Sequence, residues 1–452
     1  MKFQNPSRLI YAELEAIAAT IGNSHSEDEL PLKSDISENE IVHESEHDTN
    51  SDSLAVTLSR FDIIINLWFE PDLGCQYLMH TMMVRKLFIT VFVSLGAICY
   101  AFDEASVSNR TGKFIGLWGI GIVRFENSVC PAANGLEGIC YTRRQCTLIG
   151  GYASGKCAKV GVCCVVQVTC GATSSNNNTY FSNPLFPSTF TGASVCTLTV
   201  QRCNPDICQI RIDFLNFNLA QPNGDGTCVN DALLISGSGS NIGRICGENT
   251  GQHIYLDFNN ANDIIVNVFT SAAVTFGRQW NLRIAQIGCD SPSRAPSGCL
   301  MYYSTTSGNV RSFNYGQAAN SAIPPSNLLA VGTRQLVNMN YGICVRTASG
   351  FCGIQWSMSA GNEFAFSVSG DLTPLSLTGT DCLTDYIIIP DGSVSSTGQR
   401  ADRFCGGTFP TVTTPSRPFV LIAVTDGNEA LDSGNRGFSL SYTQQQCTNT
   451  FL

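Results

Sequence analysis

Apolar and polar residues alternate over several short stretches of the chain after residue 170. In the first of these stretches every second residue is isoleucine or phenylalanine, which would place them together on one face of a β-strand. Two further stretches are more continuously apolar, as expected for strands in the middle of a sheet. The alternating stretches are 209–214, 364–368 and 438–442, and the apolar ones are 264–269 and 419–424.

These runs are rich in β-branched and aromatic residues, and Gly, Asn and Pro interrupt them at short intervals. No long stretch with a helical period of 3.6 residues follows residue 110. The pattern therefore predicts an all-β protein built of β-sandwiches.

One arrangement of cysteines occurs twice within this region. The first copy has Cys228-Val229-Asn230-Asp231 and then Cys246-Gly247; the second has Cys382-Leu383-Thr384-Asp385 and then Cys405-Gly406. A disulfide that closes a loop of about twenty residues can contribute roughly 3 kcal/mol by restricting the unfolded chain. We therefore expect the disulfides Cys228–Cys246 and Cys382–Cys405. Their recurrence in a chain with 21 cysteines indicates a modular, oxidised, extracellular protein.

The net charge of -10 is unevenly distributed along the 452 residues. Residues 1–81 hold 15 Asp/Glu and 4 Lys/Arg, a net charge of -11, whereas residues 82–452 hold 21 and 22, a net charge of +1. The nearly neutral main part gives no electrostatic reason to expect a nucleic acid or an acidic membrane surface as partner. Residues 24–53 are acidic and rich in Ser and Asn, a composition that predicts disorder.

Residues 82–101 have the pattern of a secretory signal peptide. Arg85 and Lys86 precede an apolar run over 87–98, and small residues follow up to Ala101, after which we expect cleavage. The apolar run is shorter than the roughly twenty residues that a membrane-spanning helix needs. The sequence thus predicts a secreted protein without stable membrane insertion.

The internal position of this signal allows two interpretations. Residues 1–81 are an artefact of the gene model, with Met82 or Met83 as the true start, or the segment is an internal signal anchor behind a cytoplasmic tail. We favour the artefact. Detection of a mature N-terminus at Phe102 would support it, and peptides from residues 1–81 in secreted material would contradict it.

Residues 130–164 hold six cysteines, at positions 130, 140, 146, 157, 163 and 164. Thirty-five residues cannot bury much of a core, so disulfides must stabilise this segment. Adjacent cysteines are strained as a pair, so Cys163 and Cys164 should each bond to a distant partner. Six cysteines still allow 15 pairings.

The end of this segment, Val162-Cys163-Cys164, and Gly138-Ile139-Cys140 within it resemble clip domains, the small knots found ahead of some secreted serine proteases. The resemblance implies the pairs Cys130–Cys163, Cys140–Cys157 and Cys146–Cys164. An unclassified disulfide knot is the alternative.

Residues 170–288 and 299–447 resemble CUB domains, secreted jelly-roll sandwiches that mostly bind proteins or glycans. The residues that carry the resemblance in the first are Cys170-Gly171, 182–187, 196–200, Cys228 to Asp231 and Cys246-Gly247. Those in the second are Gly308, 312–315, Cys382 to Asp385, Cys405-Gly406 and Gly437-Phe438. We also expect the disulfide Cys170–Cys196.

Many CUB domains bind calcium through a Glu, the Asp of the Cys-x-x-Asp motif and a later Asp. The first repeat keeps Asp231 but has Ala220 and Ala272 at the other two positions, too few carboxylates for calcium. The second keeps Asp385 and has Asp426, but its Glu is not identifiable and Asp371 is a weak substitute. We therefore expect no cofactor except a candidate calcium ion at Asp385 and Asp426. The alternative is that both residues only form hydrogen bonds in turns.

Nineteen cysteines follow Ala101, an odd number. The residues without an assigned partner are Cys203, Cys208, Cys289, Cys299, Cys344, Cys352 and Cys447. One cysteine is therefore expected to be reduced or to join two chains in a disulfide-linked dimer.

Catalysis is not expected. His253 is the only histidine after residue 81, so a serine-protease triad would need it as the base. Asp432-Ser433-Gly434 superficially resembles the sequence around the serine of a protease, but no protease-sized domain remains to hold it. A zinc site would need Cys-only ligands. The cysteines of a secreted protein form disulfides instead.

The leading prediction is a secreted, non-catalytic binding module for an extracellular protein or glycan. The alternatives are a matrix component polymerised through the odd cysteine and a non-catalytic regulator of a clip-domain protease cascade. Two Asn-x-Thr sequons predict glycans at Asn109 and Asn177.

Overall fold

The computed structural model describes most of the chain after residue 126. The described ranges are 127–240, 242–259, 262–327, 331–362, 364–369, 375–427, 429 and 434–447. The predicted extension (1–81), the signal peptide (82–101), the sequon at Asn109, Asp371 and Asp432-Ser433 lie outside the described residues.

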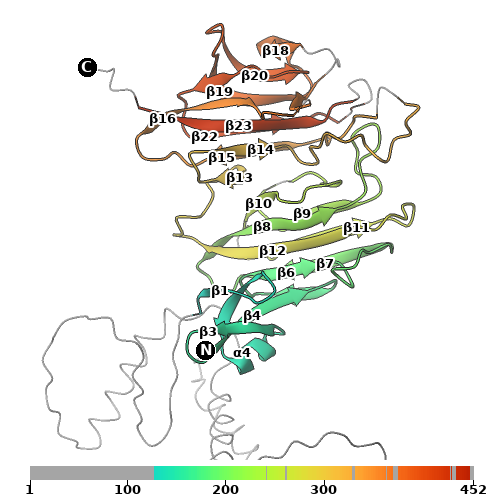
Figure 1. Ribbon diagram of the computed structural model, residues 1–452, viewed down its shortest axis with the longest axis vertical. Helices are drawn as coiled ribbons and strands as arrows, with labels where there is room; N and C mark the ends of the chain where they lie inside the picture. The colour runs from blue at the N-terminus through green and yellow to red at the C-terminus, as the bar shows by residue number, and fades with distance from the viewer. Residues whose placement is uncertain are drawn as a thin grey trace, which may run out of the picture. The chain divides into compact units, whose positions relative to one another are not determined.

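The described residues form strands almost throughout (Figure 1). The N-terminal knot contains β1 (Val129–Pro131), β2 (Glu137–Tyr141), α4 (Arg143–Leu148), β3 (Tyr152–Cys157) and β4 (Gly161–Val168). The first sandwich domain contains β5 (Ala172–Ser174), β6 (Thr179–Ser182), β7 (Ser194–Val200), β8 (Ile207–Asn218), β9 (Ala232–Ser236), β10 (His253–Asp257), β11 (Ile264–Thr270) and β12 (Gln279–Gly288). The second sandwich domain contains β13 (Cys299–Tyr303), β14 (Ser307–Arg311), β15 (Asn340–Val345), β16 (Phe351–Met358), β17 (Phe366–Ser367), β18 (Ser376–Thr378), η1 (Gly379–Asp381), β19 (Tyr386–Val394), β20 (Arg400–Gly406), β21 (Val412–Thr414), β22 (Phe419–Val424) and β23 (Gly437–Gln446).

The knot is a small antiparallel sheet, with β4 between β2 and β3, and α4 packs against it. Helix α4 begins at a capping box: the Thr142 hydroxyl accepts from the Gln145 amide, and the Gln145 side chain accepts from the Thr142 amide. The short helix was not predicted, because six residues make fewer than two turns and give no recognisable helical period in the sequence.

The knot is continuous with the first sandwich domain. Strand β4 pairs in parallel with β6, with Val166 opposite Thr179. The Tyr180 hydroxyl bonds to both the backbone amide and the carbonyl of Glu137, and the Glu137 side chain forms an ion pair with Arg283 on β12. The knot strands therefore extend one sheet of the sandwich.

The first sandwich domain has two sheets that enclose an apolar core. One runs β6-β12-β8-β10 and the other β5-β7-β11-β9. The predicted alternation is observed in β8, where Ile210, Ile212 and Phe214 are fully buried in the core. Trp280 on β12 is also fully buried there.

In the second sandwich domain the strands form one curled, continuously hydrogen-bonded sheet, because β16 and β19 both pair with β21. Strand β22 lies between β15 and β19, so the apolar run over 419–424 is a central strand as predicted. Phe366 and Val368 are buried as their alternation predicts. Phe364 instead lies at the surface, 36% exposed, against the guanidinium of Arg436.

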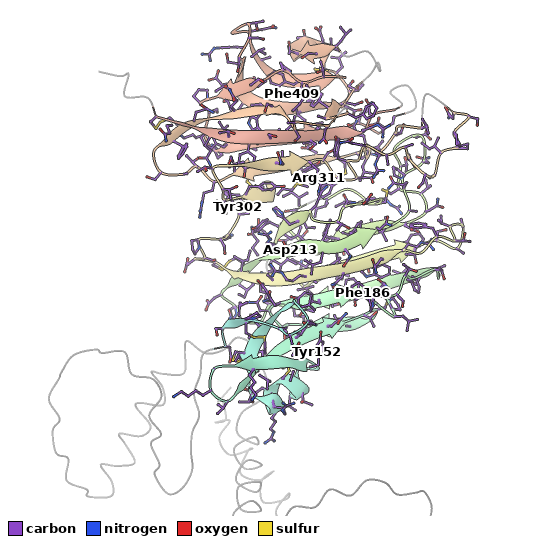
Figure 2. All side chains as sticks on the ribbon, viewed as in Figure 1. Tyr152, Phe186, Asp213, Tyr302, Arg311 and Phe409 are labelled. Atoms are coloured by element: carbon purple, nitrogen blue, oxygen red, sulfur yellow. A yellow bond between two sulfur atoms is a disulfide. The ribbon has the colours of Figure 1, made fainter. Side chains whose placement is uncertain are left out.

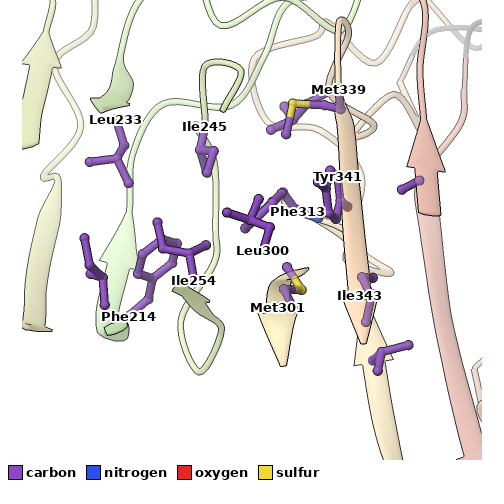
Figure 3. Packing of buried hydrophobic residues seen from close by; sticks show 14 of the residues in the cluster. Phe214, Leu233, Ile245, Ile254, Leu300, Met301, Phe313, Met339, Tyr341 and Ile343 are labelled. Atoms are coloured by element: carbon purple, nitrogen blue, oxygen red, sulfur yellow. Dashed lines mark hydrogen bonds between the residues drawn. The ribbon is translucent and has the colours of Figure 1, made fainter. Parts of the chain in front are cut away.

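One hydrophobic cluster runs from the first sandwich domain into the second. Figure 3 shows Leu300 and Phe313 of the second domain between Ile245 of the first and Tyr341 of the second. The Phe313 and Tyr341 rings lie 4.9 Å apart. The two sandwiches therefore share buried apolar surface, which is the main source of favourable free energy for their docking.

Candidate functional site

The loops at one end of the first sandwich domain meet at a buried carboxylate. Asp231, which follows the cysteine of the repeated motif, and Arg278, which precedes β12, form an ion pair in which neither side chain is exposed. Arg278 Nε donates to one oxygen of Asp231 at 2.9 Å, and Nη2 donates to the other at 3.0 Å. This two-pronged geometry is the strongest form of a charge-assisted hydrogen bond.

Backbone groups complete the surroundings of this pair. Asp231 also accepts from the amides of Ala220 at 2.8 Å and Ser271 at 3.0 Å. Arg278 also donates to the carbonyls of Ser271 at 2.6 Å and Thr191 at 3.2 Å. The pair thus joins the connections β6–β7, β8–β9 and β11–β12 at one point.

The resemblance to CUB domains assigns Ala220 and Ala272 to the two other calcium-ligand positions beside Asp231. The structure brings Ala220 to Asp231, but Ser271 rather than Ala272 makes the second contact. The sequence analysis missed Arg278. The signal that could have revealed it is an arginine directly before the last strand of each repeat, Arg278 before β12 and Arg436 before β23.

In the second sandwich domain Asp385 occupies the place of Asp231 but has different partners. It is fully buried and accepts from the Asp426 amide at 2.7 Å. Its other oxygen accepts from Gln335 Nε2 at 3.1 Å. The same nitrogen lies 2.7 Å from Glu429 Oε1 and 3.0 Å from the Val368 carbonyl. Neither Gln335 nor Glu429 was identified from the sequence.

Calcium does not fit this arrangement as it stands. Calcium is bound by six to eight oxygens, but the amide nitrogen of Gln335 lies between the carboxylates of Asp385 and Glu429. Within the described ranges no group of three or more His, Cys, Asp or Glu could hold a metal. A calcium ion at Asp385 and Asp426 would require Gln335 to move and stays a prediction.

A loop of the first sandwich domain covers this end of the second. The Val337 amide donates to the Gly226 carbonyl at 3.3 Å, and the Glu429 amide to the Asp225 carbonyl at 3.4 Å. Gly226 has φ +71, and a Cβ there would lie 2.6 Å from the Glu429 side chain. Glycine is therefore needed both for its conformation and for the close approach.

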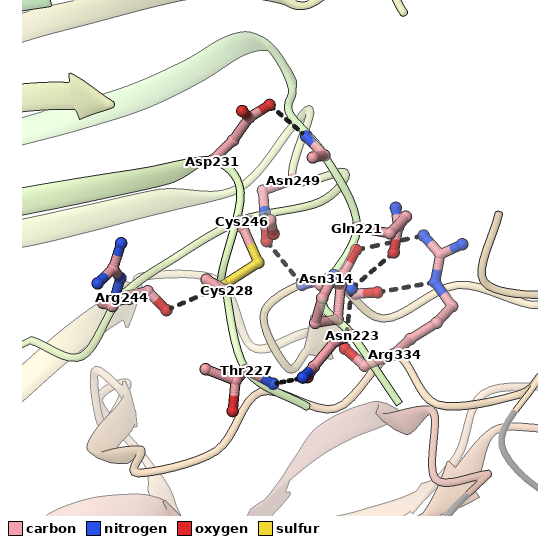
Figure 4. Close-up of a disulfide and its surroundings, with 12 residues drawn as sticks. Gln221, Asn223, Thr227, Cys228, Asp231, Arg244, Cys246, Asn249, Asn314 and Arg334 are labelled. Carbon is pink, nitrogen blue, oxygen red and sulfur yellow. Dashed lines mark hydrogen bonds between the residues drawn. A yellow bond between two sulfur atoms is a disulfide. The ribbon is translucent and has the colours of Figure 1, made fainter. Parts of the chain in front are cut away.

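Asn314 joins the two sandwich domains through side-chain hydrogen bonds (Figure 4). It is fully buried, with φ +58. Its amide nitrogen donates to Gln221 Oε1 at 2.9 Å and to the Arg334 carbonyl at 2.8 Å. Its side-chain oxygen accepts from the Glu248 amide at 2.9 Å.

His253 is a structural residue between the two domains. Its Nε2 lies 3.0 Å from the carbonyl of Tyr302, which Figure 2 labels, and only 7% of the residue is exposed. Burial, followed by the positive charge of Arg211, lowers the pKa of His253 to about 4. The imidazole is neutral at physiological pH and faces backbone rather than a nucleophile.

A cavity in the second sandwich domain, lined by residues that include Phe313, Tyr341 and Phe438, has a volume of about 20 Å³. Ligand sites usually measure about 300–1,000 Å³. This cavity can hold about one water molecule.

Nine disulfides join the cysteines of the described residues. The structure forms all six pairs expected from the sequence: Cys130–Cys163, Cys140–Cys157, Cys146–Cys164, Cys170–Cys196, Cys228–Cys246 and Cys382–Cys405. Three pairs that the sequence left open are Cys208–Cys289, Cys299–Cys344 and Cys352–Cys447.

The nine bonds use eighteen of the nineteen cysteines after Ala101, and Cys203 is the one that remains outside them. Cys203 is also disulfide-bonded, and its partner lies outside the described residues. The cysteines outside the described residues are Cys75 and Cys99, both before Ala101, so a chain cleaved after Ala101 would keep Cys203 as its odd cysteine. A disulfide from Cys203 to a second chain stays a prediction.

Asn177 is half-buried beside β12. Its side-chain oxygen accepts from the Gln286 amide at 2.8 Å and from the Asn178 amide at 2.9 Å. A glycan would be attached to the amide nitrogen instead, and glycosylation at Asn177 stays a prediction.

These features define an all-β protein of two disulfide-bonded sandwiches whose loops are held by buried polar groups. The family models agree: the CUB domain model matches residues 170–283, and the animal CUB domain model matches residues 296–445. The two matches span more than half of the chain, which therefore belongs to the CUB-domain proteins and has two CUB domains. No match is found among curated proteins.

Several solved structures are similar to part of this chain. The CUB1-EGF-CUB2 domains of rat MASP-1 are 14% identical, cover 62% of this chain and 99% of their own, and give a TM-score of 0.22. The MASP-1 CUB2 domain bound to Ca2+ is 16% identical; the match covers 26% of this chain and 98% of that domain, with a TM-score of 0.22. The full extracellular region of zebrafish Gpr126/Adgrg6 is 11% identical; the match covers 63% of this chain and 37% of that region, with a TM-score of 0.22.

None of the helices that the structure describes is long and apolar enough to cross a membrane.

Proposed function

We propose that this chain is a secreted, non-catalytic binding protein that engages an extracellular protein or glycan through its CUB domains. CUB domains commonly mediate protein interactions and are generally non-catalytic. The observation that carries the proposal is the oxidation state: every cysteine from Cys130 to Cys447 is in a disulfide. Such a density of disulfides persists only in an oxidising compartment.

The buried state of His253 supports a non-catalytic role. A general base needs a pKa near the working pH and access to a substrate proton. The pKa of His253 is lowered to about 4, and its Nε2 faces the Tyr302 backbone. Its position between the domains favours a role in docking them.

The loop end of the first CUB domain is the surface that we propose for partner binding. The connections 183–192 and 271–277 contain no charged residue. Leu185 at 83% and Phe276 at 37% are exposed there. The equivalent end of the second domain is covered by the loop around Gly226. Exposed apolar side chains on a rigid frame favour a protein partner over a charged glycan.

The proposal is tested by secreting the full chain with a C-terminal tag and crosslinking it in native extracellular fluid. We expect export into the medium, a mature N-terminus at Phe102 and one or a few discrete partners. Glycosidase treatment of the fluid separates a glycan ligand from a protein ligand. The matched control is the same bait after reduction and alkylation, which should capture none of these partners.

Other outcomes would support the competing functions. A ladder of covalent oligomers on a non-reducing gel would favour a matrix component. Capture of a clip-domain protease through residues 130–164 would favour a regulator of a protease cascade. Retention in the cytosol would contradict the proposal.

A further inference from the structure

The guanidinium of Arg278 is surrounded by oxygen ligands. It binds both oxygens of Asp231 and the backbone carbonyls of Ser271 and Thr191, at 2.6–3.2 Å. Carboxylate and backbone carbonyl oxygens are also the groups that bind calcium in proteins. The first CUB domain thus supplies a cation site and fills it with its own side chain.

The charge at this site is balanced without a metal ion. Asp231 contributes one negative charge and Arg278 one positive charge, and both side chains are completely buried. The residues whose amides contact Asp231 are Ala220 and Ser271, which carry no carboxylate. A divalent ion would leave an excess of positive charge in a buried site, which is strongly unfavourable.

The second CUB domain has an arginine at the same place but uses it differently. Arg436 also directly precedes the last strand. Its Nη1 donates to the carbonyls of Gln317 and Ala318, both at 2.6 Å, and its guanidinium lies 4.2 Å from the Phe364 ring centre. The two-pronged contact with the motif carboxylate is therefore a feature of Arg278 itself and does not follow simply from its position in the fold.

We propose that Arg278 is a built-in cation that takes the place of a metal ion in the first CUB domain. It positions the connections β6–β7, β8–β9 and β11–β12, so that this end of the domain keeps its shape whether or not calcium is present. This inference does not depend on whether the protein binds a partner there.

The test measures hydrogen exchange of the full-length protein, followed for peptides covering 183–192, 219–231 and 271–278. In the natural protein, exchange of these peptides should be the same with calcium and with a chelator. Arg278→Met should raise their exchange by about tenfold or more, because local opening becomes easier. The matched control, Arg436→Met, should leave them unchanged. Protection of these peptides by calcium in the natural protein would overturn the proposal.

A second variant covers the case in which Arg278→Met does not fold. Ala220→Glu, Ser271→Asp and Arg278→Ala together replace the guanidinium by two further carboxylates beside Asp231. Calcium should then protect the same three peptides. Adding Asp231→Asn to this variant should abolish the protection. An engineered variant that folds but gains no calcium response would contradict the idea that Arg278 occupies a cation site.

Discussion

Each CUB domain has a buried aspartate at the same place in the repeated motif, but the partners of the two aspartates differ. Asp231 and Asp385 each follow the cysteine of the repeated motif by three residues, and neither is exposed. Asp231 is neutralised by Arg278, whereas Asp385 accepts from the Gln335 amide and the Asp426 backbone. The difference shows that the fold requires a satisfied carboxylate at this position but does not fix which group satisfies it.

The surroundings of the two aspartates differ in a second respect. The end of the first domain that holds Asp231 exposes Leu185 and Phe276. The end of the second domain that holds Asp385 is covered by the loop around Gly226. The first domain therefore keeps the connections 183–192 and 271–277 at its loop end accessible, while its β8–β9 connection docks against the loop end of the second domain.

The largest effect is expected from Arg278→Met. Removing the guanidinium leaves Asp231 buried without its counter-charge, which typically costs about 3–5 kcal/mol of folding free energy. Chemical denaturation of Arg278→Met measures this loss of folding free energy, and a loss below about 1 kcal/mol would contradict the special role of Asp231–Arg278.

The disulfides of the two motifs should contribute equally to the free energy of folding. Cys228–Cys246 closes a separation of 18 residues and Cys382–Cys405 one of 23. Replacing either pair by serine should therefore cost about 3 kcal/mol. Denaturant midpoints of the two double variants provide the measurement. A much larger loss in one domain would show that its disulfide also holds the buried aspartate in place.

The docking of the domains should weaken in acid through His253. Its folded-state pKa of about 4 lies below its usual 6.5, so the unfolded chain binds the proton more tightly. The contribution of the neutral imidazole to the free energy of unfolding is complete above about pH 6.5 and is lost as the pH falls toward 4. It amounts to roughly 3 kcal/mol. Comparing the pH dependence of unfolding with that of His253→Gln isolates the effect. Identical profiles over this range would rule it out.

The smallest effect is expected from Asn314→Ala. This change removes the hydrogen bonds across the domain interface and places alanine at φ +58, at a cost of about 2–3 kcal/mol. Asn338→Ala has a similar φ of +57 at an exposed position and provides the control. The excess loss at Asn314, about 1–2 kcal/mol, reports on the interface. Thermal denaturation of both variants measures it, and equal shifts would mean that only backbone strain is involved.

The sequence predicts the parts of this molecule that repeat or alternate locally. The strand β8 follows from the alternation at Ile210, Ile212 and Phe214, and the disulfide Cys228–Cys246 from the repeated motif. Contacts between distant residues leave no such local pattern. Arg278 meets Asp231 only because β12 returns beside the β8–β9 connection, and Gln335 reaches Asp385 only across the folded second domain.

The contacts between the knot and the two CUB domains could not be predicted from the sequence either. Strand β4 of the knot pairs with β6, but nothing in the sequence of Val166 or Thr179 specifies that partner. In the sequence Gly226 looks like an ordinary turn residue. Its φ of +71 and its close contact with Glu429 show that it lies tightly packed in the domain interface. Such features depend on tertiary packing, which overrides local propensity.

The most direct test of the whole account is a disulfide map of the secreted protein, obtained by mass spectrometry of unreduced peptides. The account predicts the nine bonds described above, including Cys228–Cys246 and Cys382–Cys405, with Cys203 also oxidised. Reduced thiols at these positions, or a different pairing within the two motifs, would contradict an extracellular protein built of two disulfide-bonded CUB domains.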